Sequence, residues 1–102
     1  MLENLVFIEL KRRGFEIFYH YGKWECDFVI RNGFQIIQTI QVCDSFENEK
    51  TRQREINGLM DAMQAYSLKE GLIITSDTEE KIFTGEIQIR ILPVWKWLLG
   101  KP

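Results

Sequence analysis

Four side chains in this sequence could carry chemistry. Asp27 lies in the apolar run CDFVI, although Asp is depleted in strands. Gln41 and Cys43 lie two residues apart in IQVC, and Glu3 lies at the start of an apolar-rich segment. Carboxylate and amide oxygens are ligands for hard cations, and a thiolate is a nucleophile.

Each of these residues also has a purely structural interpretation. Glu3 is an acidic residue in a first helical turn, where the helix dipole favours it. Asp27 and Gln41 suit hydrogen-bonded positions inside a sheet. Cys43, like Cys26, suits a small core position, and no His lies beside either of them in the sequence to make a thiol nucleophile convincing.

Hydrophobic periodicity predicts the elements that must position these side chains. We expect helices over 2–13, 48–66 and 94–99, and strands over 15–21, 24–31, 34–43, 70–75, 81–83 and 87–92. The first helix is apolar over more than half its circumference, which predicts packing on more than one side.

The turn at Asn32-Gly33 is the strongest hairpin signal, because both central residues of a type I′ turn need positive φ. Side chains alternate across a sheet, so Gln41 and Cys43 share one face. The hairpin is expected to bring Asp27 near them. On a helical wheel Glu3 borders the packed side of its helix.

The segment from Phe34 to Thr75 reads as a long strand, a helix and a short strand, which fits a right-handed parallel crossover. We therefore expect an α/β domain whose mixed sheet combines an antiparallel meander with a parallel crossover strand and has helices packed on it.

Composition limits the functional classes. The chain has 102 residues, with 13 Lys and Arg against 15 Asp and Glu, which predicts one domain over 1–102 and argues against a broadly basic surface. We find no Gly-rich phosphate loop, zinc-ligand spacing, secretory signal or long apolar segment. The expected location is the cytoplasm, without a membrane partner.

Several blocks of the sequence resemble the C-terminal domain of uncharacterised prokaryotic AAA-type P-loop ATPases. These blocks are ENLVFIELKRRGFEIFYH, WECDFVI, IQVC, TRQREI, GLIIT and PVWKWLL. A helical Glu, a hairpin Asp and a following strand also resemble the core of the PD-(D/E)xK nucleases, which have the restriction-endonuclease-like fold and include archaeal Holliday junction resolvases.

The nuclease resemblance implies site residues and a cofactor. Glu3 matches the helical carboxylate and Asp27 the metal-binding Asp, whereas Gln41 stands in the place of the second strand acid. Cys43 stands in the place of the catalytic Lys. Together, Glu3, Asp27 and Gln41 would be the ligands of Mg²⁺, the cofactor that the family uses to hydrolyse phosphodiesters.

Two departures from the family pattern weaken catalysis. Gln41 brings no negative charge to a metal, and the Cys43 thiol cannot replace an ammonium group. Losing one electrostatic stabiliser typically costs on the order of 10²–10³ in rate. A lysine from elsewhere would be needed, and Lys11, Lys23 and Lys50 are the candidates.

The leading hypothesis is a degenerate nuclease-fold module, a fragment of a larger ATPase or a detached domain, that works as an accessory or interaction domain. Its expected partners are the parent ATPase module and nucleic acid. The alternatives are an active Mg²⁺-dependent endonuclease or resolvase using Glu3, Asp27 and Gln41, and an oligomerisation domain without a ligand.

Two further expectations concern packing. His20 lies between two tyrosines near a predicted turn and is expected to be exposed. Trp95 and Trp97 point about 200° apart on a helix, so only one of them can face the core and the other is available to a partner.

Overall fold

The computed structural model describes residues 1–100, which form three helices and six strands. The elements are α1 (Leu2–Arg12), β1 (Glu16–Tyr21), β2 (Glu25–Asn32), β3 (Gln35–Val42), α2 (Glu49–Ala65), β4 (Glu70–Thr75), β5 (Glu80–Thr84), β6 (Ile87–Pro93) and α3 (Val94–Leu98). Their order is the one that the hydrophobic pattern predicts.

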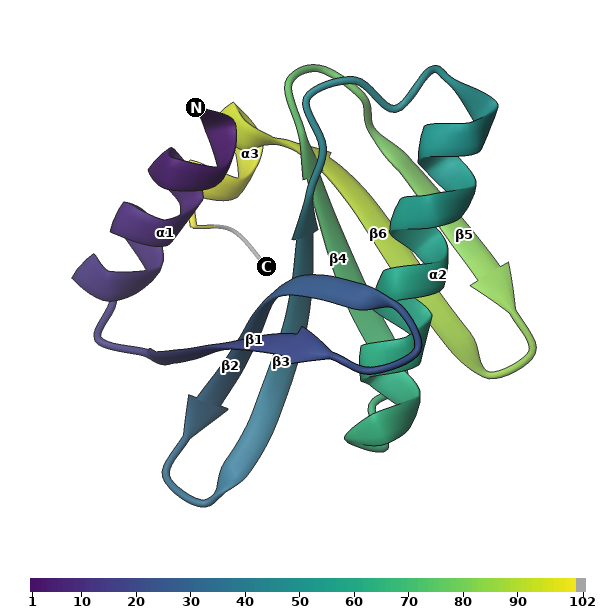
Figure 1. The fold of residues 1–102 in the computed structure, drawn as a ribbon. Coiled ribbons are helices and arrows are strands. Elements are labelled where there is room, and N and C mark those ends of the chain that lie inside the picture. The colour runs from purple at the N-terminus through teal and green to yellow at the C-terminus, as the bar shows by residue number, and fades with distance from the viewer. Residues whose placement is uncertain (101–102) are drawn as a thin grey trace.

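All six strands belong to one mixed sheet with the order β1-β2-β3-β4-β6-β5. The first three strands form an antiparallel meander, and β5 is antiparallel to β6. The pairs β3–β4 and β4–β6 are parallel, and α2 connects β3 to β4 (Figure 1). The predicted meander and parallel crossover are therefore confirmed.

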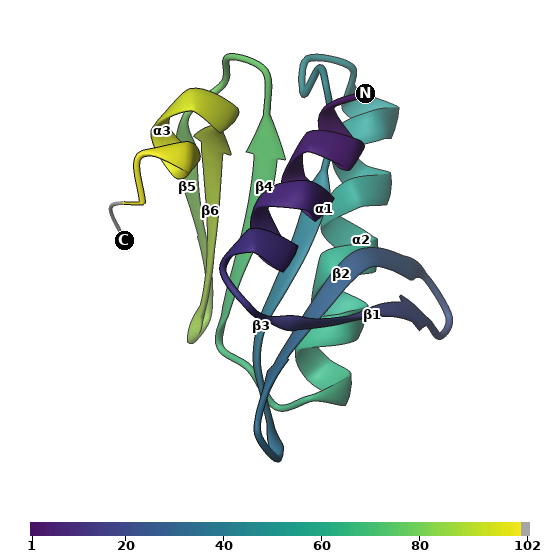
Figure 2. The ribbon, with the colours of Figure 1, turned by 90° about the vertical axis from the view of Figure 1, so that its left-hand side faces the viewer.

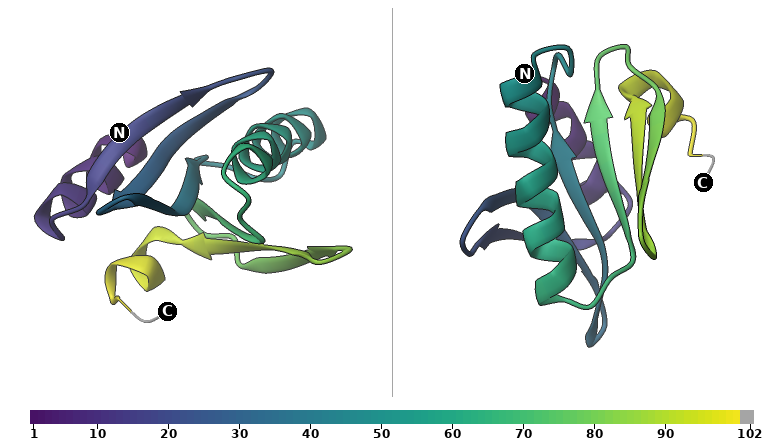
Figure 3. Two further views of the ribbon diagram at one scale, coloured as in Figure 1. Left: turned by 90° about the horizontal axis from the view of Figure 1, so that it is seen from below. Right: turned by 90° about the vertical axis from the view of Figure 1, so that its right-hand side faces the viewer.

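The helices cover the two faces of the sheet unequally. Helix α2 lies on one face, whereas α1 and α3 lie on the other (Figures 2 and 3). Each face has its own apolar core: Val6, Leu10 and Trp97 belong to the first, and Leu59 and Met63 to the second.

Helix α1 packs on one side only. Its buried residues are Leu2, Val6 and Leu10, which lie four apart and face the sheet. Leu5 and Ile8 on another side are 41% and 56% exposed. The expectation that this helix packs on more than one side is wrong for residues 1–100, because α1 faces a single sheet surface.

The β2–β3 hairpin is confirmed, but its turn is shifted by one residue from the predicted one. Asn32 pairs with Gln35, so the two central residues are Gly33 and Phe34. Gly33 has φ +68°, while Phe34 has no positive φ. A positive φ at the first central residue is the arrangement of a type II′ turn, which explains why glycine is needed there.

Helix α2 begins where its cap predicts. The side chain of Asn48 accepts a hydrogen bond from the Thr51 N–H at 3.1 Å. This bond satisfies one of the free donors of the first turn. Within residues 1–100 we find no helix with the length and apolar character needed to cross a membrane.

Candidate functional site

Asp27 and Gln41 lie side by side where β2 and β3 part. The backbone N–H of Asp27 donates to Gln41 Oε1 at 2.8 Å. The backbone N–H of Val42 donates to Asp27 Oδ2, also at 2.8 Å. Each side chain therefore replaces a ladder bond of the sheet, and the hairpin brings the two residues together as expected.

The Gln41 amide also binds α2 to the sheet. Its side chain is buried, and Nε2 donates to the Glu25 carbonyl at 3.0 Å and the Glu55 carbonyl at 3.1 Å. A Cβ at Gly58 would lie 2.0 Å from the Glu25 carbonyl oxygen and 2.5 Å from Gln41 Nε2. Only glycine permits this close approach of the helix.

A pocket of about 390 Å³ opens beside these two residues. One wall is the turn between β1 and β2, and the other is the first half of α2. The lining residues are Tyr21, Lys23, Trp24, Glu25, Asp27, Gln41, Arg54 and Glu55. Their mixture of carboxylates, cations and aromatic rings makes this pocket the candidate functional site.

Two carboxyl groups in the pocket have raised pKa values. Burial raises the pKa of Asp27 to about 6, assisted by the charges of Glu3 and Glu25 and opposed by the Val42 N–H. Burial also raises the pKa of Glu55, and the charge of Asp27 adds to the effect. Neighbouring acids with perturbed pKa values are typical of functional sites.

Glu55 is an acidic residue of the pocket that the sequence did not single out. It comes from α2, far from the hairpin in the chain. A signal was present: Glu55 lies four residues before buried Leu59, so it falls on the side of the helix that faces the sheet.

The predicted ligand Glu3 lies apart from this pocket. It lines a separate depression with Met1, Asn4, Phe7 and Phe28. Its charge nevertheless raises the pKa of Asp27. Glu3, Asp27 and Gln41 therefore do not line a common cavity.

The donor set does not fit Mg²⁺ as it stands. Across residues 1–100, no three His, Cys, Asp or Glu side chains are grouped closely enough to hold a metal ion. The Gln41 carbonyl oxygen and one Asp27 oxygen already accept backbone hydrogen bonds. The metal role of Glu3, Asp27 and Gln41 stays a prediction.

Cys43 occupies a core position. It is 9% exposed, and its thiol donates to the Ser45 carbonyl at 2.9 Å. Burial is the main reason that its pKa is raised, so the thiol is neutral near pH 7. Of the three lysines considered as a replacement cation, Lys23 is the one that lines the pocket with Asp27.

His20 is buried, so the expectation that it is exposed is wrong. Its side chain faces α2, where Nε2 lies 2.9 Å from Asp61 Oδ2. The register of β1 shifts between Phe18 and His20. Such a shift turns the following side chains relative to the preceding ones, and local sequence does not reveal it.

No family model matches the chain. It is 40% identical over 110 residues to the uncharacterized protein MJ1544 of Methanocaldococcus jannaschii. The match covers 97% of this chain and 24% of that protein, so the chain spans about a quarter of the length of this curated relative.

Proposed function

We propose that this chain is a degenerate nuclease-fold module that acts as an accessory or interaction domain of a larger AAA-type ATPase. The restriction-endonuclease-like assignment of the fold is part of the proposal. It is supported by the order of the elements: a helix, an antiparallel meander and a parallel crossover.

The observation that carries this proposal is that Cys43 is buried and neutral and that the Gln41 side chain is fully hydrogen-bonded within the fold. Phosphodiester cleavage in the PD-(D/E)xK family would need an ammonium group at position 43, and a buried neutral thiol stands there. The Gln41 amide is committed to three backbone groups of the fold. Both positions therefore stabilise the domain where an active enzyme would need free catalytic groups.

An exposed apolar surface supports the interaction role. Helices α1 and α3 lie on the same face of the sheet (Figure 2). Their exposed side chains include Leu5, Phe7 and Ile8 of α1, and Trp95 and Leu98 of α3. Large exposed apolar side chains on neighbouring helices are a feature of many protein-binding surfaces.

The parent ATPase is the proposed partner. The sequence blocks that resemble the C-terminal domains of such ATPases suggest it, and the relative from Methanocaldococcus jannaschii is about four times longer than the matched segment. A cytoplasmic location belongs to the same proposal, because Cys26 and Cys43 are both free thiols.

A cleavage assay tests the proposal. The purified domain is incubated with branched, single-stranded and duplex DNA while MgCl₂ is titrated. We expect no metal-dependent cleavage. Cleavage that is lost in Asp27→Ala, but kept in the exposed control Asp44→Ala, would contradict the proposal and establish a nuclease.

One observation favours that second function, a Mg²⁺-dependent endonuclease or resolvase. Lys23 and Arg54 line the same pocket as Asp27, so positive charge reaches the site from a different part of the chain. In this alternative Glu3, Asp27 and Gln41 would bind the metal after two changes: the Gln41 hydrogen bonds rearrange, and Glu3 moves from its separate depression toward the pocket.

The exposed Trp95 favours a third function, oligomerisation without a ligand. Light scattering of the purified domain and of Trp95→Gln tests this alternative. A dimer that dissociates in Trp95→Gln would support it, whereas a monomer in both cases would exclude it.

A further inference from the structure

Strand β5 forms the outer edge of the sheet on the side opposite to β1. It pairs with β6 alone, and that pairing has no register shift. In Figures 1 and 3 no other element of residues 1–100 lies beyond it. The other edge, β1, has a register shift between Phe18 and His20, and such irregularities oppose further pairing. Strand β5 is therefore the regular edge that is open to another strand.

The backbone of Lys81 and Phe83 faces this open edge. The N–H of Gln88 donates at 2.9 Å to the carbonyl of the residue before β4, so it turns away from β5 and Phe83–Gln88 is a non-hydrogen-bonded pair. Bonded and non-bonded pairs alternate along antiparallel strands. Lys81–Arg90 is therefore also non-bonded, whereas Ile82 bonds β6. The N–H and C=O groups of Lys81 and Phe83 thus point outward.

The side chains of these two residues are also without partners. Phe83 is 68% exposed, and the exposed Lys81 takes part in none of the ion pairs within residues 1–100. Both side chains lie on one face of the sheet. Ile82 lies on the other face, where it packs against the core beneath α2. A cation and an aromatic ring two residues apart are complementary to the same two residues running in the opposite direction.

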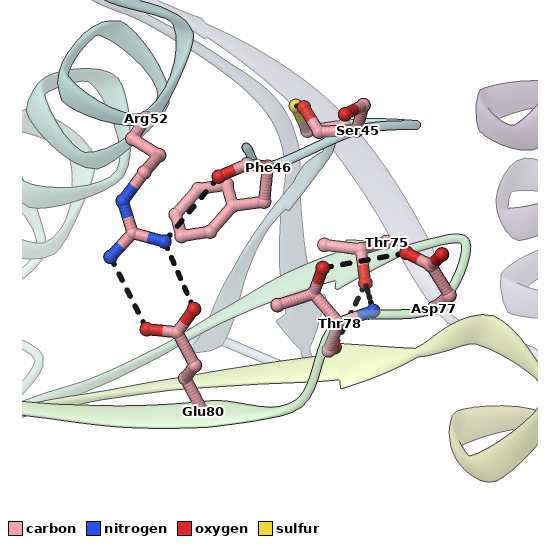
Figure 4. A network of polar contacts seen from close by, with 8 residues as sticks. Ser45, Phe46, Arg52, Thr75, Asp77, Thr78 and Glu80 are labelled. Carbon is pink, nitrogen blue, oxygen red and sulfur yellow. Dashed lines mark hydrogen bonds and ion pairs between the residues drawn. The ribbon is translucent and has the colours of Figure 1, made fainter. Parts of the chain in front are cut away.

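The start of β5 is held in place from both faces of the sheet. Arg52 of α2 stacks on Phe46 at 4.3 Å and bonds both carboxylate oxygens of Glu80, as Figure 4 shows. On the other face, Lys96 of α3 donates to Glu79 at 2.6 Å. A strand that is already fixed loses little conformational entropy when it binds a second strand.

We propose that β5 pairs antiparallel with β5 of a second copy of this chain, which gives a reversible dimer with a continuous sheet. A twofold axis between the two Ile82 residues places Lys81 of each copy opposite Phe83 of the other. The outward N–H and C=O groups of each such pair then bond one another. The ammonium group of Lys81 lies against the ring of Phe83, and Ile82 faces its own copy on the α2 side.

The charges and the strand length select this register. An axis at Lys81 would place two ammonium groups opposite one another, which is unfavourable. An axis at Phe83 would leave Lys81 opposite Gly85 in the turn of the hairpin. Only the axis at Ile82 pairs every residue of Glu80–Thr84 with a residue of the same segment.

The dimer should be weak and closed. One edge strand buries less than the roughly 1,200 Å² of a stable interface, so the two copies exchange with monomers. Pairing about a twofold axis uses the same edge of both copies and stops at two. The inference goes beyond the proposed function, because β5 lines neither the candidate pocket nor the apolar surface of α1 and α3.

Sedimentation equilibrium up to millimolar concentration measures the association of the parent chain and of four variants. Phe83→Lys and the double variant Lys81→Glu/Phe83→Lys change the proposed contact. Phe34→Lys is the matched control, because Phe34 is an exposed ring on a different hairpin. Trp95→Gln tests the exposed surface of α3. Urea unfolding establishes that each variant is folded.

We expect a monomer–dimer equilibrium for the parent chain. Phe83→Lys should raise the dissociation constant about tenfold or more, because each of the two symmetric pairs exchanges an attraction for a repulsion. Adding Lys81→Glu places opposite charges across both pairs and should restore an affinity near that of the parent. Phe34→Lys and Trp95→Gln should dimerise as the parent does.

Amide hydrogen exchange measured by NMR tests the register without any substitution. The N–H groups of Lys81 and Phe83 should exchange more slowly as the concentration rises, whereas the N–H of Ile82, already bonded to β6, should not change. Four results would each overturn the inference: a parent chain that stays monomeric at millimolar concentration, an assembly that grows beyond two copies, a dimer that Phe83→Lys leaves intact, and a dimer that Trp95→Gln dissociates. None of them bears on DNA cleavage or on ATPase binding, so the proposed function is tested separately.

Discussion

Asp27 and Gln41 each satisfy a backbone group of the strand that carries the other. The Asp27 N–H donates to Gln41 Oε1, and Asp27 Oδ2 accepts from the N–H of Val42, the residue after Gln41. The two side chains hold β2 and β3 together where regular pairing has stopped. The residues that match a nuclease site therefore also stabilise the sheet. A substitution at either position will lower stability as well as any activity, so both must be measured.

Replacing Gln41 will cost stability before it affects any activity. Gln41→Leu leaves the Asp27 N–H without its partner and removes the amide that donates to the carbonyls of Glu25 and Glu55. We expect the free energy of unfolding to fall by about 2–4 kcal/mol, because buried polar groups that lose their partners are costly. Urea denaturation measures it.

Gln35→Leu is the control for this variant, since Gln35 is an exposed residue of the same strand. Its expected change is within about 0.5 kcal/mol. Equal effects of the two substitutions would mean that the Gln41 hydrogen bonds do not stabilise the junction.

The raised pKa of Asp27 predicts that this residue destabilises the fold at neutral pH. Its pKa in the folded protein is about 6 and its ordinary value is 3.8. The folded state therefore binds the proton more tightly, and stability falls as pH rises between these values. Above pH 6 the full penalty of the ionised carboxylate is present.

Asp27→Asn tests this pH dependence. The amide keeps an oxygen for the Val42 N–H and removes the charge. We expect the variant to be more stable than the parent by about 1–2 kcal/mol at pH 7.5, after allowance for partial exposure, and by much less at pH 4. Urea unfolding at both pH values measures the difference, and Asp44→Asn, an exposed site, should show none. A change in the unfolding free energy of Asp27→Asn that is the same at pH 7.5 and at pH 4 would contradict the raised pKa of Asp27.

Gly58→Ala should destabilise the protein although it lies inside a helix. Alanine normally stabilises a helix by roughly 0.5–1 kcal/mol relative to glycine. Here the added Cβ would overlap the Glu25 carbonyl, so α2 must move away from Gln41. We expect a loss of about 2 kcal/mol or more, as for other overpacked sites.

Thermal unfolding monitored by circular dichroism measures the effect of Gly58→Ala, with Gln53→Ala on the exposed side of α2 as the control. A rise in melting temperature for Gly58→Ala would show that the helix does not approach the sheet as closely as described.

The two tryptophans of α3 should behave differently. Trp97 is 7% exposed and stacks under Arg13 at 4.5 Å, whereas Trp95 is 59% exposed. Trp97→Ala should cost about 3–5 kcal/mol of stability, as for other buried aromatic residues. Trp95→Gln should leave urea unfolding nearly unchanged.

Trp95→Gln should instead weaken association with the proposed ATPase partner, which a pull-down with the purified ATPase module, without this domain, measures. Unchanged capture by Trp95→Gln would remove Trp95 from the proposed interaction surface.

Local sequence was sufficient for the elements and for part of the site. The change from helical to strand periodicity after Gly14 and the Gly33 hairpin follow from backbone geometry, which acts over a few residues. The meeting of Asp27 and Gln41 follows as well, because a short hairpin leaves little freedom in how two strands pair. The exact turn was less predictable, since Asn32-Gly33 and Gly33-Phe34 turns differ by one residue in register.

The sequence by itself determined the order of the elements, the absence of a cation at position 43 and the glycines at the turns. Only the tertiary structure decided that Glu55 joins Asp27, that His20 is enclosed by α2, and that one side of α1 stays uncovered. The reason is physical. Periodicity depends on hydrogen bonds between near neighbours in the chain, whereas the packing of a helix on a sheet depends on register shifts and close approaches between distant segments.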